Sequence, residues 1–183
     1  MGLQPIKRWN LQTSQEEWPK SIEGSQVHSG FLDGYTAARE DMLDAVLRLA
    51  KAYPDYSIAL VGHSLGGARA ALALLDLATT EPQLVPRLSM YSYGAPRVGN
   101  SAFAKAIGDL DVPVYRVVYE DDVVPHLPPS SFGFVHHNIE DWIHEGEHQF
   151  CRSTEQSDTC SGGGGGLAVD VSAHYAYPGL KYE

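Results

Sequence analysis

Apolar residues recur at helical spacing over residues 31–53, the first long patterned segment of the chain. The apolar positions of this stripe are Phe31, Tyr35, Ala38, Met42, Ala45, Val46, Leu49 and Tyr53. Pro54 follows directly. Proline lacks an amide proton and clashes with the preceding turn, so it ends a helix. The pattern therefore predicts one amphipathic helix that closes before Pro54.

Short apolar runs of strand character alternate with helical segments further along the chain. The predicted strands are Ser57–Val61, Leu88–Tyr93 and Val112–Tyr119, and Phe134–Ile143 is a candidate for one more. Helical spacing recurs at Ala68, Leu72 and Leu75, before Pro82, and again over Ser101–Ile107. This alternation predicts a mostly parallel sheet with helices on both faces, an α/β class.

Composition narrows the class of protein. The 183 residues suit a single domain over 1–183, and 43% hydrophobic with 20% charged residues is typical of a globular protein. The formal net charge of -10 argues against nucleic acid and against anionic membranes as partners. No apolar stretch approaches the ~18 residues of a transmembrane helix. Residues 1–26 carry no signal-peptide pattern.

Cysteine and glycine usage mark the later part of the chain. Cys151 and Cys160 lie in a polar segment, where we expect a local disulfide, with two inert thiols as the alternative. A disulfide would indicate an oxidising compartment. The glycine run 162–166 predicts a flexible connector outside any packed element.

The candidate chemistry centres on residues 61–67, Val-Gly-His-Ser-Leu-Gly-Gly, a G-x-S-x-G pattern between a predicted strand and a predicted helix. Such a turn holds its serine in strained backbone geometry, and the flanking glycines remove side chains that would clash. The helix N-terminus behind Ser64 offers N–H groups to a developing negative charge. The pentapeptide alone also occurs as an ordinary turn. Its flanking elements favour a nucleophile, and we expect His63 to support the turn rather than to transfer protons.

A serine nucleophile needs a histidine as base and a carboxylate that orients the imidazole. Catalytic groups gather at the carboxyl ends of parallel strands. Glu120, Asp121 and Asp122 follow the predicted strand that ends at Tyr119, and His174 lies near the C-terminus. The chain order serine, acid, histidine is the order of G-x-S-x-G hydrolases. The pattern therefore predicts a triad, with the choice among the three acids open.

Several longer motifs are similar to the fungal-type class 3 lipase family of α/β-hydrolases, which also contains feruloyl esterases. The matching stretches are Val27–Phe31 (Val-His-Ser-Gly-Phe), Val61–Gly66, Tyr93–Asn100 (Tyr-Gly-Ala-Pro-Arg-Val-Gly-Asn), Asp122–Pro129 (Asp-Val-Val-Pro-His-Leu-Pro-Pro) and Asp170–His174. The resemblance implies an α/β-hydrolase fold and a triad of Ser64, Asp122 and His174, since the family's acid precedes the Val-Val-Pro segment. It also implies a disulfide loop at the cysteine pair, as in some relatives.

The family's oxyanion donors are only partly matched. The backbone N–H of Leu65 is the expected first donor. The family takes its second donor from a Ser or Thr after a Phe-Arg-Gly-like strand end, and residues 1–26 have no strand's apolar content. We expect 1–26 to be a lid-like or loop segment, with Leu3 at the donor position if Ile6–Trp9 begins the lid helix. The sheet is then incomplete at its N-terminal edge, which favours aggregation. Losing one donor costs on the order of 10²–10³ in turnover, so we expect weak hydrolysis.

The resemblance implies a carboxylic-ester hydrolase that forms an acyl-enzyme on Ser64. Acylglycerols are the first expected substrate class and feruloyl-type esters the alternative. A non-catalytic hydrolase-fold protein that binds lipids or a partner is the alternative from another class. The chemistry requires no cofactor and no metal. Contact with a lipid–water interface stays open, and secretion is expected from the resemblance.

Residues 144–148, His-Glu-Gly-Glu-His, match the H-E-x-x-H signature of zinc proteases. That chemistry needs both histidines on one face of a stable helix, with Glu145 as base. Gly146 lies in the middle, and no apolar helical stripe surrounds the motif. The pattern favours a solvated acidic loop over a metal site.

Overall fold

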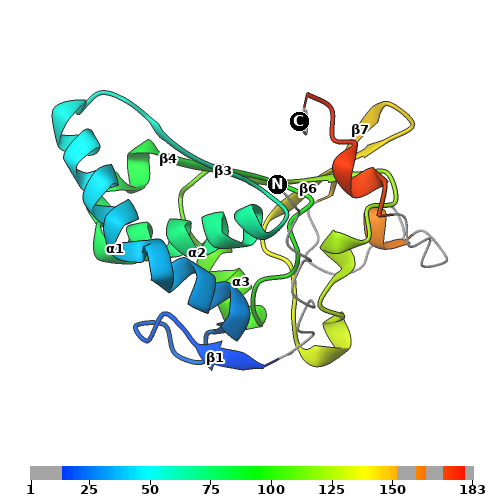
Figure 1. Ribbon diagram of the computed structural model, residues 1–183, viewed down its shortest axis with the longest axis horizontal. Coiled ribbons are helices and arrows are strands. Elements are labelled where there is room, and N and C mark those ends of the chain that lie inside the picture. The colour runs from blue at the N-terminus through cyan, green and yellow to red at the C-terminus, as the bar shows by residue number, and fades with distance from the viewer. Residues whose placement is uncertain (1–13, 152–159, 164–170, 180–183) are drawn as a thin grey trace, which may run out of the picture.

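The computed structural model describes residues 14–151, 160–163 and 171–179. Its centre is a five-stranded sheet in the order β3-β4-β5-β6-β7, in which β3 to β6 are parallel and β7 is antiparallel (Figure 1). The strands are β3 Ile58–His63, β4 Leu88–Tyr93, β5 Val114–Tyr119, β6 Ile139–His144 and β7 Glu147–Cys151. The three predicted strands are therefore confirmed, with bounds shifted by up to two residues. The candidate strand Phe134–Ile143 is present as β6, which begins five residues later than expected.

The predicted helices are confirmed as well. They are α1 Ser29–Ala52, α2 Leu65–Thr80 and α3 Ser101–Gly108. Short 3-10 helices connect the larger elements: η1 Pro82–Arg87, η2 Val124–His126, η3 Ser130–Phe132, η4 Ser161–Gly163 and η5 Ala173–Tyr175. None of the helices within the described ranges has the length and apolarity to cross a bilayer.

The helix α2 lies at the centre of the core, because leucine and alanine occupy most of its positions. Leu72, Leu74 and Leu77 have no exposed surface. One buried carboxylate, Asp76, accepts hydrogen bonds from Tyr35 Oη at 2.5 Å and from Arg39 Nε at 2.6 Å. Burial and the neighbouring Asp76 carboxylate raise the pKa of Tyr35. These bonds fasten α1 to α2 and fix the helix that begins directly after Ser64.

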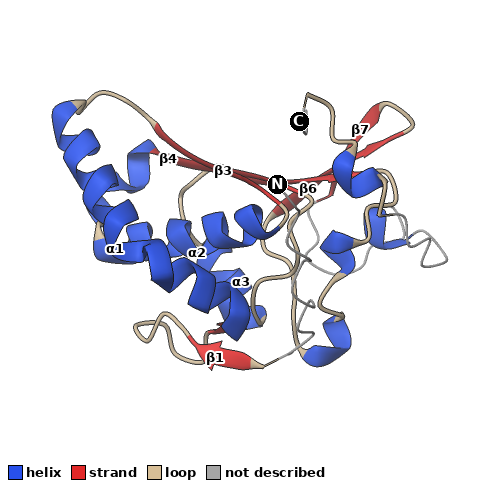
Figure 2. Cartoon of the chain, in the orientation of Figure 1, coloured by secondary structure: helices blue, strands red, loops and turns tan. Residues whose placement is uncertain are grey.

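The helices α1, α2 and α3 lie on the same side of the sheet (Figure 2), whereas the alternation predicted helices on both faces. On the other face, the side chains of Val61 and Tyr91 are 62% and 37% exposed. Strand β3 is the edge of the sheet and pairs with β4 alone among the described strands.

The N-terminal part of the described chain departs from the expected loop. Residues Gln15–Glu17 form β1, which pairs antiparallel with β2, Gln26–His28. The prediction that 1–26 is a lid-like or loop segment is therefore wrong for β1. This strand is polar and mostly exposed, so the apolar pattern that reveals buried strands is absent. The proposed lid start, Ile6–Trp9, lies outside the described residues.

The H-E-x-x-H motif lies on a β-hairpin. Glu145 and Gly146 form its turn between β6 and β7, with φ of 52° and 83°. Two-residue hairpin turns require positive φ, which glycine adopts readily. The expected acidic loop is wrong, and the helix that a zinc protease needs is not formed here. The dipeptide Glu-Gly was the available turn signal.

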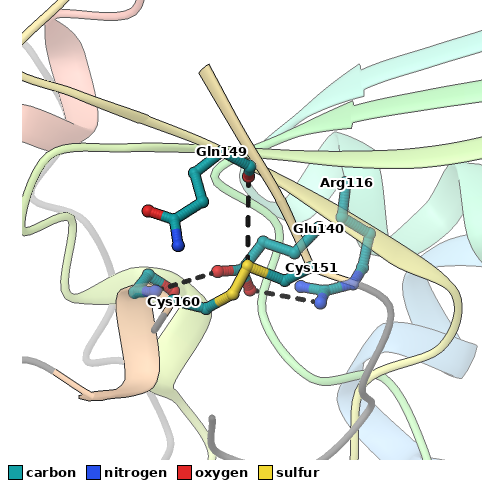
Figure 3. The surroundings of a disulfide bond; sticks show 6 residues. Arg116, Glu140, Gln149, Cys151 and Cys160 are labelled. Atoms are coloured by element: carbon teal, nitrogen blue, oxygen red, sulfur yellow. Dashed lines mark hydrogen bonds and ion pairs between the residues drawn. A yellow bond between two sulfur atoms is a disulfide. The ribbon is translucent and has the colours of Figure 1, made fainter. Parts of the chain in front are cut away.

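The expected disulfide joins Cys151, the last residue of β7, to Cys160 (Figure 3). Glu140 of β6 lies beside it, accepting a hydrogen bond from Arg116 Nη2 at 3.2 Å and one from the backbone N–H of Ser161 at 3.1 Å. Burial lowers the pKa of Arg116, and Glu140 opposes that shift. The prediction that the glycine run 162–166 is a flexible connector is wrong for its first two glycines, which belong to η4. Residues 164–166 lie outside the described chain.

Candidate active site

Ser64 lies on the sharp turn between β3 and α2. Its backbone has φ 56° and ψ -127°, a region that non-glycine residues rarely adopt. Two hydrogen bonds hold the turn: Ser64 N–H donates to Tyr93 O, and Gly67 N–H donates to Ser64 O, both at 2.9 Å. The strained serine that the pattern predicted is therefore confirmed as a feature of the backbone.

The glycines around Ser64 let the start of α2 approach the sheet. A Cβ on Gly62 would lie 2.3 Å from the carbonyl of Gly66, and one on Gly67 would lie 2.7 Å from Ala95 Cβ. A side chain at either position would require the neighbouring atoms to move. The sequence pattern thus reflects close contact between two elements.

Ser64, His174 and Asp122 are brought together into one hydrogen-bonded chain. His174 Nε2 lies 2.8 Å from Ser64 Oγ, and His174 Nδ1 lies 2.9 Å from Asp122 Oδ2 and 3.1 Å from Oδ1. Asp122 is fully buried and His174 is nearly so. A carboxylate on Nδ1 keeps the proton there, which leaves Nε2 free to accept the serine proton. The arrangement can therefore remove a proton from Ser64.

Two further donors serve the Asp122 carboxylate. Tyr177 Oη donates to Oδ2 at 2.6 Å, and the backbone N–H of Val124 donates to Oδ1 at 2.9 Å. The Tyr177 hydroxyl in turn accepts a bond from Tyr119 N–H at 3.2 Å. These bonds compensate a carboxylate that has lost all contact with water. Sequence reasoning missed Tyr177, whose one available signal is its place three residues after His174.

Gly94, at the end of β4, makes room for the same carboxylate. Its φ is 58°, and a Cβ there would lie 2.6 Å from Asp122 Oδ2, 2.9 Å from Tyr177 Oη and 3.0 Å from His174 Nδ1. Both the positive φ and the crowding require glycine. The residue therefore shapes the space in which the acid and the imidazole meet.

The loop that follows Asp122 is held by one buried guanidinium group and one buried imidazole. Arg97 donates through Nη1 to the carbonyls of His126 and Pro128, and His136 Nε2 lies 2.7 Å from Pro125 O. Burial lowers the pKa of Arg97, and it lowers the pKa of His136 well below its ordinary value. A neutral His136 has one N–H, which the Pro125 carbonyl accepts. This polar packing fixes the backbone that presents Asp122.

The expected oxyanion donor, Leu65, is the first residue of α2, so its backbone N–H belongs to the unpaired N-terminus of that helix. Leu3, the expected position of the second donor, lies outside the described residues. The structure also offers no separate metal centre within its described ranges. Glu140, Cys151 and Cys160 approach one another closely there, but the disulfide occupies both sulfur atoms.

The family model described as Lipase (class 3) matches residues 5–132. The chain is 43% identical to a lipase of Rhizopus niveus over 145 residues, which cover 78% of this chain and 37% of that protein. It is 34% identical over 162 residues to the secreted mono- and diacylglycerol lipase 1 of Fusarium solani, covering 85% of this chain and 47% of that protein. The chain thus spans about half the length of these relatives or less.

The fold has a solved counterpart. A triacylglycerol lipase, described as having a serine protease triad as its catalytic centre, superposes with a TM-score of 0.83 and 40% identity. The superposition covers 90% of this chain and 63% of that one. The expected α/β-hydrolase fold is therefore confirmed.

Proposed function

The chain belongs to the class 3 lipase family, and from that premise we propose that it is a serine carboxylic-ester hydrolase. The observation that carries the proposal is the hydrogen-bonded chain from Ser64 Oγ through His174 to the buried Asp122. A hydroxyl, an imidazole and a carboxylate in this order form the relay that activates a serine.

In the first half-reaction, Ser64 Oγ attacks the ester carbonyl carbon while His174 Nε2 accepts the serine proton. The carbonyl oxygen becomes an oxyanion, to which the Leu65 N–H donates. The intermediate then collapses, and the bond to the leaving alcohol breaks as His174 returns the proton to the alcohol oxygen. The product is an acyl ester on Ser64.

In the second half-reaction, water attacks the acyl-enzyme with His174 as base. The proton returns to Ser64 Oγ when the carboxylic acid leaves. Asp122 stays ionised throughout and stabilises the imidazolium that forms in each half. Its donors, Tyr177 and Val124 N–H, hold the carboxylate beside the Nδ1 of His174, where it stabilises the positive charge.

Acylglycerols are the proposed substrate class, in preference to feruloyl-type esters. The mono-, di- and triacylglycerol lipases that the chain resembles support this choice. Exposed apolar side chains also flank the reacting groups: Leu65 follows Ser64, and Val171 and Tyr175 flank His174, all more than a third exposed. Such a surface suits an acyl chain and contact with a lipid–water interface. Secretion is part of the proposal, supported by the disulfide and by the secreted relative.

The test is covalent labelling by a serine-reactive fluorophosphonate, followed by hydrolysis of a soluble p-nitrophenyl ester. We expect the label on Ser64, and no labelling or hydrolysis by Ser64→Ala. A folded wild-type chain that takes no label would instead support a non-catalytic protein that binds lipids or a partner.

A further inference from the structure

His63 is the last residue of β3, immediately before Ser64, and its side chain contacts the segment that carries His174. His63 Nε2 lies 2.9 Å from the backbone carbonyl oxygen of His174. The two imidazole rings have centroids 4.5 Å apart at an interplanar angle of 34°. The ring of Tyr177 meets His63 edge-on at 5.5 Å. His63 is therefore packed between the base and the tyrosine that binds the acid.

A carbonyl oxygen only accepts, so the His63 Nε2 must carry the proton in this bond. Burial lowers the pKa of His63, which favours the neutral ring, and the carbonyl partner then places the one proton on Nε2. Neutrality suits the site, because His174 becomes cationic as Ser64 attacks. A second positive ring 4.5 Å away would oppose that charge.

The local structure around His174 explains why such a contact matters. His174 lies in η5, a 3-10 helix of only three residues, Ala173–Tyr175. A single turn is not stable by itself, so tertiary contacts must fix it. Asp122 binds the side chain of His174 through Nδ1, whereas His63 binds its main chain. Together the two contacts define both the ring orientation and the place of the backbone from which the ring projects.

We propose that His63 is a positioning residue, whose Nε2–H bond to the His174 carbonyl holds the catalytic imidazole at proton-transfer distance from Ser64. The proposal rests on the ester-hydrolase function proposed above. It assigns the residue before the nucleophile a role toward the base, beyond the expected support of the turn. A misplacement of about 1 Å in a reacting group can lower a rate about 10²-fold.

Two amide variants separate the hydrogen bond from burial and polarity. In His63→Gln the side-chain N–H₂ reaches the place of the imidazole Nε2 and can donate to the same carbonyl. In His63→Asn the amide is one methylene shorter and falls short of it. We expect His63→Asn to lower kcat and the rate of fluorophosphonate labelling about 10- to 100-fold, with KM nearly unchanged, and His63→Gln to restore most of the loss.

His63→Phe, which keeps an aromatic ring without a donor, is expected to behave like His63→Asn. Replacement of the exposed His148 by Gln, Asn and Phe provides the matched control, expected to match wild type. Thermal unfolding of each variant shows whether it is folded. If His63→Gln or His63→Asn is misfolded, the comparison of His63→Phe with wild type decides. If His63→Phe is misfolded, the comparison of His63→Gln with His63→Asn decides.

The inference is overturned if folded His63→Asn or His63→Phe labels at the wild-type rate, or if Gln and Asn lower the rate equally. An unlabelled wild-type chain overturns the hydrolase function itself, together with this inference. Labelling of the wild-type chain therefore distinguishes failure of the His63 inference from failure of the hydrolase function.

Discussion

Tyr177 Oη and His174 Nδ1 bind the same oxygen of Asp122, at 2.6 and 2.9 Å respectively. The tyrosine follows the histidine by three residues, so one short C-terminal segment supplies both partners of the acid. The acid is therefore satisfied only when this segment is docked. Stability and catalysis are linked at this point of the molecule.

Tyr177→Phe tests that link. The variant removes one donor from a fully buried carboxylate, and a hydrogen bond to a charged group contributes about 1.5–3 kcal/mol. We expect a loss of about that size in the free energy of unfolding, measured with urea, and slower labelling of Ser64. Tyr175→Phe, at an exposed tyrosine beside His174, is the control and should unfold like wild type. Equal stability of Tyr177→Phe and wild type would contradict the proposed role.

Gly94→Ala tests the space around the acid. The new Cβ would meet Asp122 Oδ2 at 2.6 Å on a backbone with φ 58°. The left-handed conformation alone costs about 1–2 kcal/mol, and the contact adds to it. We expect lower stability and loss of labelling. Gly24→Ala is the matched control, since Gly24 has φ 71° and its Cβ would meet nothing within 4 Å. It should lose only the stability that the backbone conformation costs and should keep labelling.

The buried His137 predicts acid sensitivity of the fold. Burial lowers its pKa to about 3, whereas the unfolded chain has the ordinary value of about 6.5. The unfolded state therefore binds the proton first, and stability is complete above about pH 6.5 and falls as the pH drops toward 3. The slope from this group is about 1.4 kcal/mol per pH unit. Urea unfolding at pH 7 and pH 5 measures it.

His137→Gln isolates this contribution from that of the carboxylates. Glutamine does not titrate, so the difference in unfolding free energy between wild type and variant should shrink or reverse as the pH is lowered. A difference that stays constant from pH 7 to pH 5 would show that His137 does not titrate as its burial indicates.

The disulfide predicts redox-dependent stability. Cys151 and Cys160 close a short loop with a sequence separation of 9 residues, for which the chain-entropy relation gives about 2–3 kcal/mol. Dithiothreitol should lower the melting temperature of wild type. The double variant Cys151→Ser with Cys160→Ser should start lower and not respond. The predicted stabilisation by the disulfide is contradicted if the reductant frees both thiols and the melting temperature of wild type does not change.

The sequence predicted the turn at Ser64 because strand, glycine and helix signals are local there. The parallel strands were also predictable, since buried runs such as Leu88–Tyr93 are continuous in apolar character. The polar strand β1 and the hairpin β6–β7 were missed or misread. Strand β1 pairs with the nearby β2 but is polar and carries no apolar pattern, and the hairpin depends on a turn whose dipeptide is a weak signal.

The choice of acid shows the same limit. Glu120, Asp121 and Asp122 are equivalent by position, and the family motif alone selected Asp122. The structure shows a physical difference: Glu120 binds the hairpin through His144 Nδ1 and Glu145 N–H, whereas Asp121 is exposed. Asp122 alone of the three is buried against His174. No local pattern encodes that distinction, nor the contact from Tyr177.

The reacting serine and its base are 110 positions apart in the chain, and the base and its acid are 52 apart. A folding intermediate in which the segment carrying His174 has not docked therefore has no base beside Ser64, and its serine is not activated. During refolding, the recovery of fluorophosphonate reactivity would time the closure of the loop between Ser64 and His174, while circular dichroism would follow the formation of the helices.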